Sequence, residues 1–327
     1  MTLVAFDLPS QPGGDAAPAP DWRRAAQAME GRILSYSERK LPVLLQWLAF
    51  HGAAEGLGAL GGVVSRPGGS IAVLRIEGFL AERGAGPNPE AGGYEEIRAR
   101  LAAALADPHV RGIALVFDSD GGEISGALDT AEAIYRARKV KPIWSIVSYR
   151  ACGTACLLAT AANVVIVGSL GTMGGIGALQ LRFDLSRAYA TEGIVMNPIT
   201  FGKRKADGLP FLPMSKPERA QAQRDVDAIG TMFVNAVARF RGMRPEKVLA
   251  QQAATFMDAK AVRAGLADRI AKGFPIDELE GFRSFLTRLG TGGPAAAAPT
   301  RSLAAPRRLP ARAAPAHHFV FRGIGRG

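Results

Sequence analysis

The chain has 327 residues, of which 48% are hydrophobic and 21% charged, and its formal net charge at pH 7 is +11. This length allows a sizeable core. Much of the positive excess is six arginines that follow residue 290, where no acidic residue occurs. The rest of the chain is therefore only mildly basic, and its charge is no evidence for a nucleic-acid-binding body.

The cysteines and histidines argue against a metal site. Cys152 and Cys156 are the two cysteines, four residues apart on one predicted helix with no histidine nearby. This arrangement supports neither a zinc site nor a disulfide framework, and it fits a reducing compartment. We expect no cofactor and no metal.

The N-terminal region shows no signal for secretion or membrane insertion. Acidic residues occur throughout the first forty positions, without a basic start followed by an apolar run. The most apolar early stretch, residues 42–50, is far shorter than the roughly 20 residues that span a bilayer. We expect a cytoplasmic protein without membrane contact, in which this stretch is a docking helix.

Composition and periodicity then divide the chain in order. Residues 1–20 are rich in Pro, Gly and Ala and are predicted to be disordered, and residues 21–66 are predicted to be a helical extension. A Pro-Gly-Gly turn starts the main domain, 67–275. Apolar strands are predicted at 71–76, 111–117, 142–147 and 163–167, and helices at 94–106, 123–138 and 154–162. This alternation is typical of parallel β-α-β crossover units.

The second half of the chain continues the alternation and ends in a tail. Further strands are predicted at 176–181 and 194–199, and helices at 185–191, 216–241, just after Pro245, and 259–270 with a C-cap at Gly265. Residues 276–289 are predicted to be a short helix and linker. The Ala, Pro and Arg-rich residues 290–327 are predicted to be a disordered basic tail, either solvated or in contact with nucleic acid or an acidic partner.

Four segments carry residue types suited to chemistry. The strand end at 117–123 contains Gly121 and Gly122, whose uncovered N–H groups can face an oxyanion. The stretch 148–162 is a polar turn that opens an Ala-rich helix, the usual mount for a nucleophile. The glycine-rich run 168–177 lacks a dinucleotide or P-loop pattern. The basic loop 201–208 offers Lys205, because a desolvated lysine can act as a general base.

Together and in this order, the four segments resemble the serine peptidases of the signal peptide peptidase A family, most closely the phage prohead proteases of the minor capsid protein C type. The resemblance covers about residues 71–270. It implies an α/β fold of the Clp protease/crotonase type, peptide hydrolysis by a Ser/Lys dyad, and ring-like homo-oligomers. By this resemblance Gly121 and Gly122 form the oxyanion turn, and Lys205 is the base.

The sequence departs from the family pattern at the site. Gly153 stands where the family has its nucleophilic serine, Asp120 stands where proline usually precedes the two glycines, and Gly175 stands where a second serine is common. Gly174 and Gly175 are expected to line the site with Asp120. Both hydroxyl groups of the family's arrangement are therefore missing.

Three explanations of the missing serine stay open. Thr154 or Cys152, on the two flanks of Gly153, is a relocated nucleophile. Alternatively hydrolysis is lost, which leaves a peptide-binding or capsid-assembly scaffold. In the third explanation the alignment is shifted, and Ser145, Ser148 or Ser169 supplies the hydroxyl.

Two other enzyme classes share the expected fold. A Ser-His-Asp triad is disfavoured, because no histidine lies between His109 and His317. A crotonase-type acyl-CoA enzyme would use Glu123 as its acid or base, although Glu123 also suits the first turn of a helix. The sequence therefore favours a phage-type peptidase, active or degenerate, with peptide or capsid scaffold as partner and a procapsid or prophage context.

Overall fold

The computed structural model describes residues 33–36, 63–64, 70–82, 93–273 and 277–290, and within these ranges its centre is a ten-stranded sheet. Four parallel strands form the middle: β3 (Ser70–Leu80), β4 (Val110–Glu123), β5 (Ile143–Cys152) and β6 (Val164–Val167). Helices α3 (Tyr94–Ala106), α4 (Ala127–Ala137) and α5 (Thr154–Thr160) connect them in turn. The predicted β-α-β class and the order of these elements are confirmed.

Short strands extend this centre at both sides. β10 (Arg269–Ile270) pairs with β6, and β7 (Thr172–Gly174) pairs with the end of β5 and with β9 (Thr255–Met257). β2 (Val63–Val64) pairs with β3. β1 (Ile33–Tyr36) lies between the end of β4 and β8 (Leu179–Gln180), antiparallel to both.

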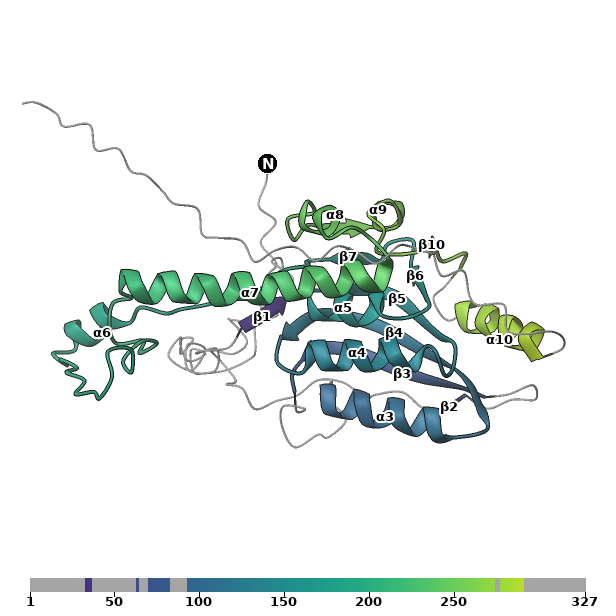
Figure 1. Cartoon of the computed structure of the whole chain (residues 1–327), viewed down its shortest axis with the longest axis horizontal. Helices are drawn as coiled ribbons and strands as arrows, with labels where there is room; N and C mark the ends of the chain where they lie inside the picture. Colours follow the sequence, from purple (N-terminus) through teal and green to yellow (C-terminus); the bar gives the residue numbers. More distant parts are fainter. Residues whose placement is uncertain (1–32, 37–62, 65–69, 83–92, 274–276, 291–327) are drawn as a thin grey trace, which may run out of the picture.

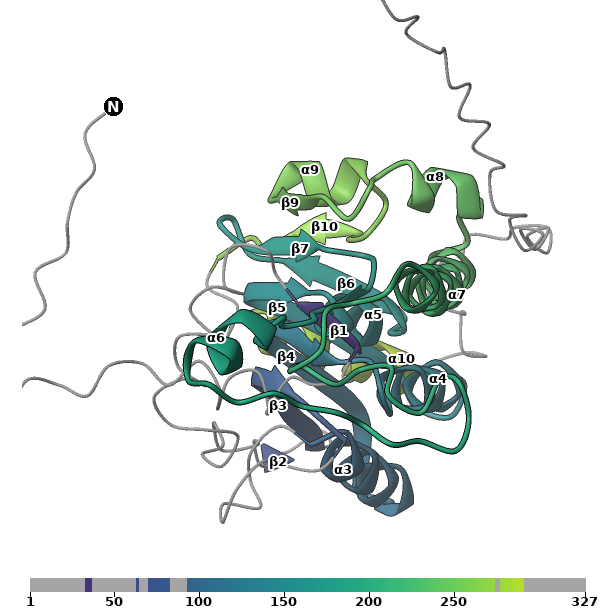
Figure 2. The same ribbon diagram turned by 90° about the vertical axis from the view of Figure 1, so that its left-hand side faces the viewer.

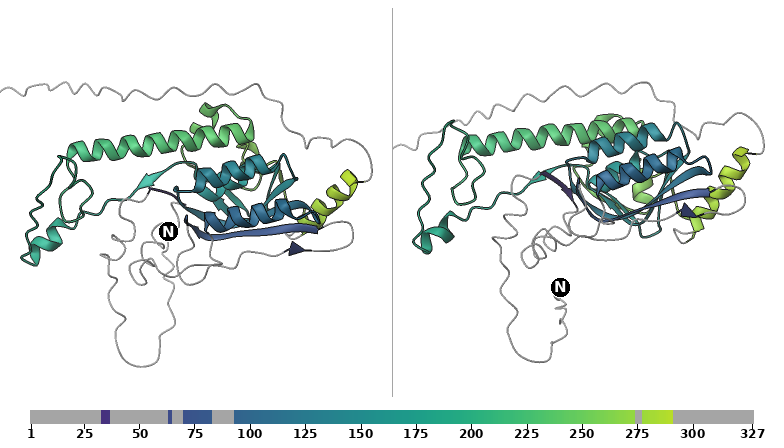
Figure 3. Two further views of the ribbon diagram at one scale, coloured as in Figure 1. Left: turned by 60° about the horizontal axis from the view of Figure 1, so that its bottom comes forward. Right: turned by 90° about the horizontal axis from the view of Figure 1, so that it is seen from below.

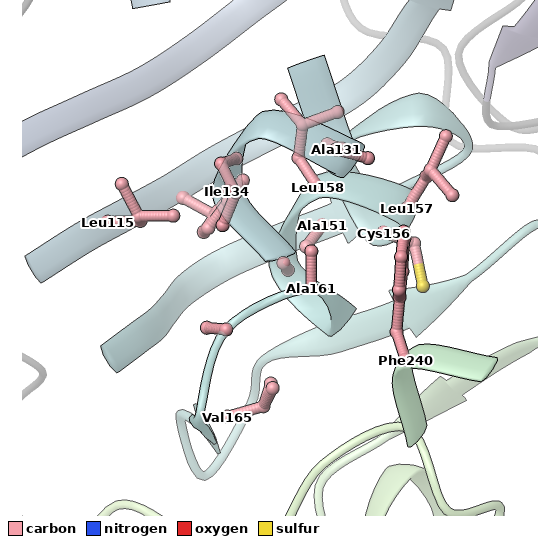
Figure 4. Close-up of a cluster of buried hydrophobic side chains, with 14 of the residues drawn as sticks. Leu115, Ala131, Ile134, Ala151, Cys156, Leu157, Leu158, Ala161, Val165 and Phe240 are labelled. Atoms are coloured by element: carbon pink, nitrogen blue, oxygen red, sulfur yellow. The ribbon is translucent and has the colours of Figure 1, made fainter. Parts of the chain in front are cut away.

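Both faces of the sheet are covered, which explains why its strands are apolar at consecutive positions. On one face, side chains such as Leu115 and Val147 pack under α3, α4, α5 and the C-terminal part of α7 (Lys216–Arg241) (Figures 1 and 2). Figure 4 shows part of this core, where Cys156 of α5 lies beside Phe240 of α7.

The second face is covered by α10 (Asp277–Gly290). Its Phe282 ring stacks on Trp144 of β5, with 4.5 Å between ring centroids. A Cβ atom at Gly112 of β4 would come within 2.7 Å of the Phe282 ring. Glycine at this position therefore lets the helix lie flat on the sheet.

The segment from Arg182 to Met232 projects from the sheet, and we call it the arm (Figures 1 and 3). It contains α6 (Ser186–Thr191) and the first part of α7, and none of residues 182–232 is buried. Ser215 caps α7: its hydroxyl accepts the N–H of Glu218 at 3.2 Å, and the Glu218 carboxylate accepts the N–H of Ser215. The chain then returns through α8 (Pro245–Leu249) and α9 (Ala259–Arg263).

The structure corrects several predicted boundaries. β4 runs on to Glu123, so Gly121 and Gly122 lie in a strand and not in a turn, and α4 begins only at Ala127. The strand predicted at 176–181 is reduced to β8, and the helix predicted at 259–270 ends as α9 before Gly265, whose φ is +83°. The strand predicted at 194–199 is wrong: these residues of the arm are exposed, and no strand of the described residues pairs with them.

The N-terminal prediction is also corrected in part. Residues 33–36 and 63–64, within the predicted helical extension, form strands β1 and β2 because sheet edges are available to them. The disorder predicted for 1–20 and for the tail after residue 290, and the docking helix at 42–50, lie outside the described residues. The domain boundaries stay a prediction.

Candidate active site

The centre of the site is the turn between β5 and α5, Cys152 to Thr154, which we call the elbow. Gly153 in its middle has φ +53° and ψ −127°, a conformation that side-chain-bearing residues rarely adopt. A strained strand-to-helix turn of this kind is where α/β hydrolases expose a nucleophile. The backbone of Gly153 therefore has the conformation expected of a nucleophile position, and glycine offers no nucleophilic side chain.

Two glycines of the predicted site lie directly against the elbow. The N–H of Gly153 donates to the carbonyl of Gly174 at 2.9 Å. A Cβ atom at Gly175 would lie 3.1 Å from the nitrogen of Gly153, and one at Gly174 would lie 2.3 Å from the carbonyl oxygen of Ala254. Gly174 and Gly175 thus form one wall of the site, as a strand end with positive φ at both residues.

The end of β4 forms the opposite wall. Ser119 of β4 pairs with Ala151 of β5, so Gly121, two residues further along, comes beside the elbow. The N–H of Gly121 donates to the Ser119 hydroxyl at 3.1 Å, and that hydroxyl donates to the carbonyl of Gly78 at 2.6 Å. In this conformation the Gly121 amide already has a partner, and the oxyanion role of Gly121 and Gly122 stays a prediction.

Asp120, which replaces the expected proline, belongs to a charged cluster at this strand end. It is 6% exposed, and its Oδ2 atom lies 3.2 Å from Nε of Arg150 on β5. The same guanidinium lies 3.3 Å from Oδ1 of Asp118. The Arg150 guanidinium thus forms ion pairs with both carboxylates. Arg150 is not among the site residues predicted from the sequence.

The two residues that flank Gly153 are buried. Thr154 is 0% exposed, and its hydroxyl lies near the phenol of Tyr94 on α3. Burial raises the pKa of Tyr94, and the neighbouring Thr154 hydroxyl opposes that rise. The Tyr94 hydroxyl donates to the carbonyl of Glu123 at 2.7 Å. The Thr154 side chain therefore belongs to the packed interior under α3, which the sequence did not indicate.

The thiols are equally enclosed. Cys152 is 1% exposed and Cys156 0% exposed. Burial raises the pKa of the Cys156 thiol to about 12. Because the thiolate is the nucleophilic form of cysteine, burial disfavours a nucleophilic role for Cys156.

Lys205 is exposed and belongs to the arm, which projects from the sheet (Figure 1). Three residues further on, the N–H of Gly208 donates to the carboxylate of Glu218 at 2.9 Å, so this loop is held at the N-terminal end of α7. Buried residues of α7 begin at Phe233, about 22 Å along the helix from Glu218 at 1.5 Å per residue. The structure therefore separates the predicted base from the predicted nucleophile position.

The remaining candidates lie elsewhere. Ser145 is fully buried within β5, Ser148 is half-buried on the same strand, and Ser169 is exposed after β6. Glu123 ends β4, and its main chain is held by Tyr94. A role for Ser145, Ser148 or Ser169 as the source of the hydroxyl stays a prediction.

Within the described ranges, no cluster of His, Cys, Asp or Glu is placed to hold a metal ion. Within the same ranges, no helix combines the length and apolar character that crossing a membrane requires.

Comparison with known proteins gives the class first. Residues 136–273 match the model of peptidase family S49, which is 138 of the 327 residues. The family resemblance predicted from the four segments is thereby confirmed. The parallel β-α-β sheet described above agrees with the predicted α/β class, and its assignment to the Clp/crotonase type stays a prediction.

Two phage proteins each match this chain over 202 residues, which is 61% of its length. The chain is 37% identical to the head-tail preconnector protein GP5 of Enterobacteria phage P21 and 35% identical to the capsid assembly protease C of Escherichia phage lambda. The matched region spans 40% of the first relative and 46% of the second, so less than half of either.

Solved structures with similar folds include a membrane-bound stomatin-specific protease, at 12% identity and a TM-score of 0.42, covering 64% of this chain and 82% of that one. Another is an enoyl-CoA hydratase/isomerase family member, at 15% identity and a TM-score of 0.41, covering 70% and 77%.

Proposed function

We propose that this protein is a phage capsid-assembly component of the S49 type that binds extended peptide at the elbow and has lost serine-dependent hydrolysis. The observation that carries the proposal is Gly153: its backbone has the strained conformation of a nucleophile position, yet it has no side chain. The buried positions of Thr154 and Cys152 support the same conclusion, because neither side chain is presented to a peptide.

The capsid context rests on the two relatives, whose names place them at the head-tail preconnector and in capsid assembly. We propose a procapsid or prophage setting in the bacterial cytoplasm, with a segment of capsid or scaffold protein as the peptide. Contact of the basic tail with nucleic acid or an acidic partner stays a prediction.

The separation of Lys205 from its own elbow supports a homo-oligomer. The loop that carries Lys205 is fixed to the far end of α7 by Glu218. Exposed apolar side chains, Ile199 and Phe201, stand beside it in the arm. We propose that the arm of one copy reaches the elbow of a neighbouring copy, where Lys205 lies near Gly153.

The test of lost hydrolysis compares cleavage of casein and of a capsid scaffold by the parent protein and by Gly153→Ser. We expect no cleavage by the parent and measurable cleavage by the serine variant, which disappears when Lys205→Ala is added. Cleavage by the parent that is abolished by Thr154→Ala or Cys152→Ala would instead identify a relocated nucleophile and contradict the proposal.

The test of the neighbouring-copy arrangement is complementation. The parent lacks the serine, and the double variant Gly153→Ser/Lys205→Ala lacks the lysine. If the lysine acts from a neighbour, mixing these two inactive proteins restores cleavage. No activity in the mixture, with full activity of Gly153→Ser alone at all protein concentrations, would show that the dyad forms within one chain.

The crotonase-type alternative has less support. The S49 match covers β5, the elbow and β7, which are the elements of the site itself. We therefore retain the peptidase-type site as the basis of the proposal.

A further inference from the structure

Strand β1 fills the sheet position beside the elbow. Beyond Ser119, β4 no longer pairs with β5, because β5 ends at Cys152 and the chain turns into α5. The edge of β4 from Gly121 to Glu123 is thereby opened. Residues 33–36 pair with that edge: Tyr36 with Gly121, Ser35 with Gly122 and Leu34 with Glu123.

The side of β4 on which β1 lies follows from the register. β3 already occupies the other edge, where Phe79 pairs with Gly121 and Leu80 with Gly122. β1 must therefore lie on the edge that faces the elbow. Its second partner is β8, which follows β7 along the chain, and β7 is itself a neighbour of β5. β1 thus lies in the sheet where β5 would continue if it did not end at the elbow, and it pairs with the edge of β4 on one side and the edge of β8 on the other.

A slot with a free strand edge on each side is the geometry in which proteins bind extended peptides through main-chain hydrogen bonds. The residue nearest Gly153 in register is Tyr36, through its pairing with Gly121. A peptide bound at the elbow would need the same edges of β4 and β8. The chain's own strand and an external peptide therefore compete for one position.

We infer that residues 33–36 are a tethered occupant of the peptide slot, which a partner peptide must displace. This inference rests on the proposed peptide-binding function, and it states how binding is regulated: residues 33–36 compete with the partner peptide for the slot. A tethered segment acts at an effective concentration in the millimolar range. The parent protein should accordingly bind external peptide about tenfold or more weakly than a variant whose β1 cannot pair.

The experiment uses the full chain with Leu34→Pro and, independently, Ser35→Pro. Both positions lie in a strand with neighbours on both sides, where proline removes a ladder hydrogen bond. Leu34→Val and Ser35→Thr are the matched controls, because β-branched residues keep the strand. The probe is a fluorescent peptide with the sequence Arg-Ile-Leu-Ser-Tyr-Ser of residues 32–37, with a scrambled peptide as reference. Thermal unfolding of each variant verifies that the body remains folded.

The expected result is protection of the amides of residues 33–36 from hydrogen exchange in the parent, together with probe binding at least tenfold tighter in both proline variants than in the parent and controls. If the amides of residues 33–36 exchange without protection and all proteins bind the probe equally, the inference is overturned. The proposed peptide binding would still stand in that case. Protected amides without probe binding by either proline variant would make β1 a permanent structural strand, which overturns the inference and also contradicts the proposed peptide binding.

Discussion

The two halves of α7 show how the same helix serves two unlike regions. From Phe233 to Phe240, six of its side chains are buried against the sheet and its helices, whereas none is buried from Lys216 to Met232. The first half depends on local interactions: the Ser215 cap and pairs one turn apart, such as Gln221 with Asp225 at 2.7 Å. The body is thus held by packing and the arm by hydrogen bonds and charge.

The largest effect should come from the packed half. Phe233→Ala removes a fully buried ring, and we expect a loss of about 3–5 kcal/mol in the free energy of unfolding. The neighbouring Met232→Ala, at a side chain 54% exposed, should change it by less than about 0.5 kcal/mol. Urea denaturation measures both. Equal losses would contradict the division of α7 at this point.

The attachment of α10 to the body should depend on pH. The hydrogen bond from Arg269, at 3.0 Å, holds the pKa of the Glu278 carboxyl below its ordinary value of 4.5. Because the folded-state pKa is the lower one, this stabilisation is present above pH 4.5 and is lost as the pH falls through the folded-state value. Glu278→Gln should lower the free energy of unfolding by about 1.5–3 kcal/mol at pH 7. In acid, the free energy of unfolding of this variant should approach that of the parent.

Denaturation at pH 7 and pH 3.5 tests this dependence. Glu280→Gln is the matched control on the same helix, because Glu280 forms an exposed pair with Arg283. A difference between parent and Glu278→Gln that is equally large at both pH values would mean that the carboxylate charge does not stabilise α10.

At the base of the arm, Glu218 joins three elements. Its carboxylate accepts hydrogen bonds from Arg182 and Gly208, both at 2.9 Å, and from the N–H of Ser215. Glu218→Ala should lower the local stability of the arm by about 1 kcal/mol. This loss should appear as faster hydrogen exchange of the amides of residues 202–212, while the free energy of global unfolding changes little. Asp225→Asn, on the same helix, should leave that exchange unchanged. A large loss of global stability would show that the arm and the body unfold together.

The smallest effect on stability should come from the arm surface. Phe201 is 103% exposed, so Phe201→Ser should change the free energy of unfolding by less than about 0.5 kcal/mol. If the arm contacts a neighbouring copy, the same variant lowers the association constant measured by sedimentation velocity. Leu170→Ser, at an exposed apolar residue of the body, is the control. An equal effect of both variants on association would argue against the arm as the contact.

The sequence predicted the parts of this molecule in which local pattern and tertiary packing agree. The β-α-β order follows from apolar strands that are buried on both faces, and the bounds of the long helix at 216–241 agree with α7. The strand-to-helix turn at Gly153 agrees with the sequence prediction, because a strand followed by an Ala-rich helix leaves little choice there, and its role as the centre of the site stays a prediction.

The predictions fail where the structure of a segment depends on whether a distant strand lies beside it. Residues 33–36 form a strand only because the edge of β4, about 85 positions later, accepts them. Residues 194–199 have strand-like composition, yet no strand lies beside them in the arm. The contact between Tyr94 and Thr154 joins two helices that are 60 residues apart. Periodicity carries no information about such partners.

The conformation of Gly153 also bears on how the chain evolved. A serine at φ +53° carries a strain of about 1–3 kcal/mol, which an active enzyme must retain at its nucleophile. Glycine adopts the same conformation without that cost. If the proposed loss of hydrolysis is correct, glycine at this position removes the strain that a serine would carry and leaves the neighbouring strands in place. A single substitution would then separate a chain that cuts its partner from one that holds it, with no loss of stability.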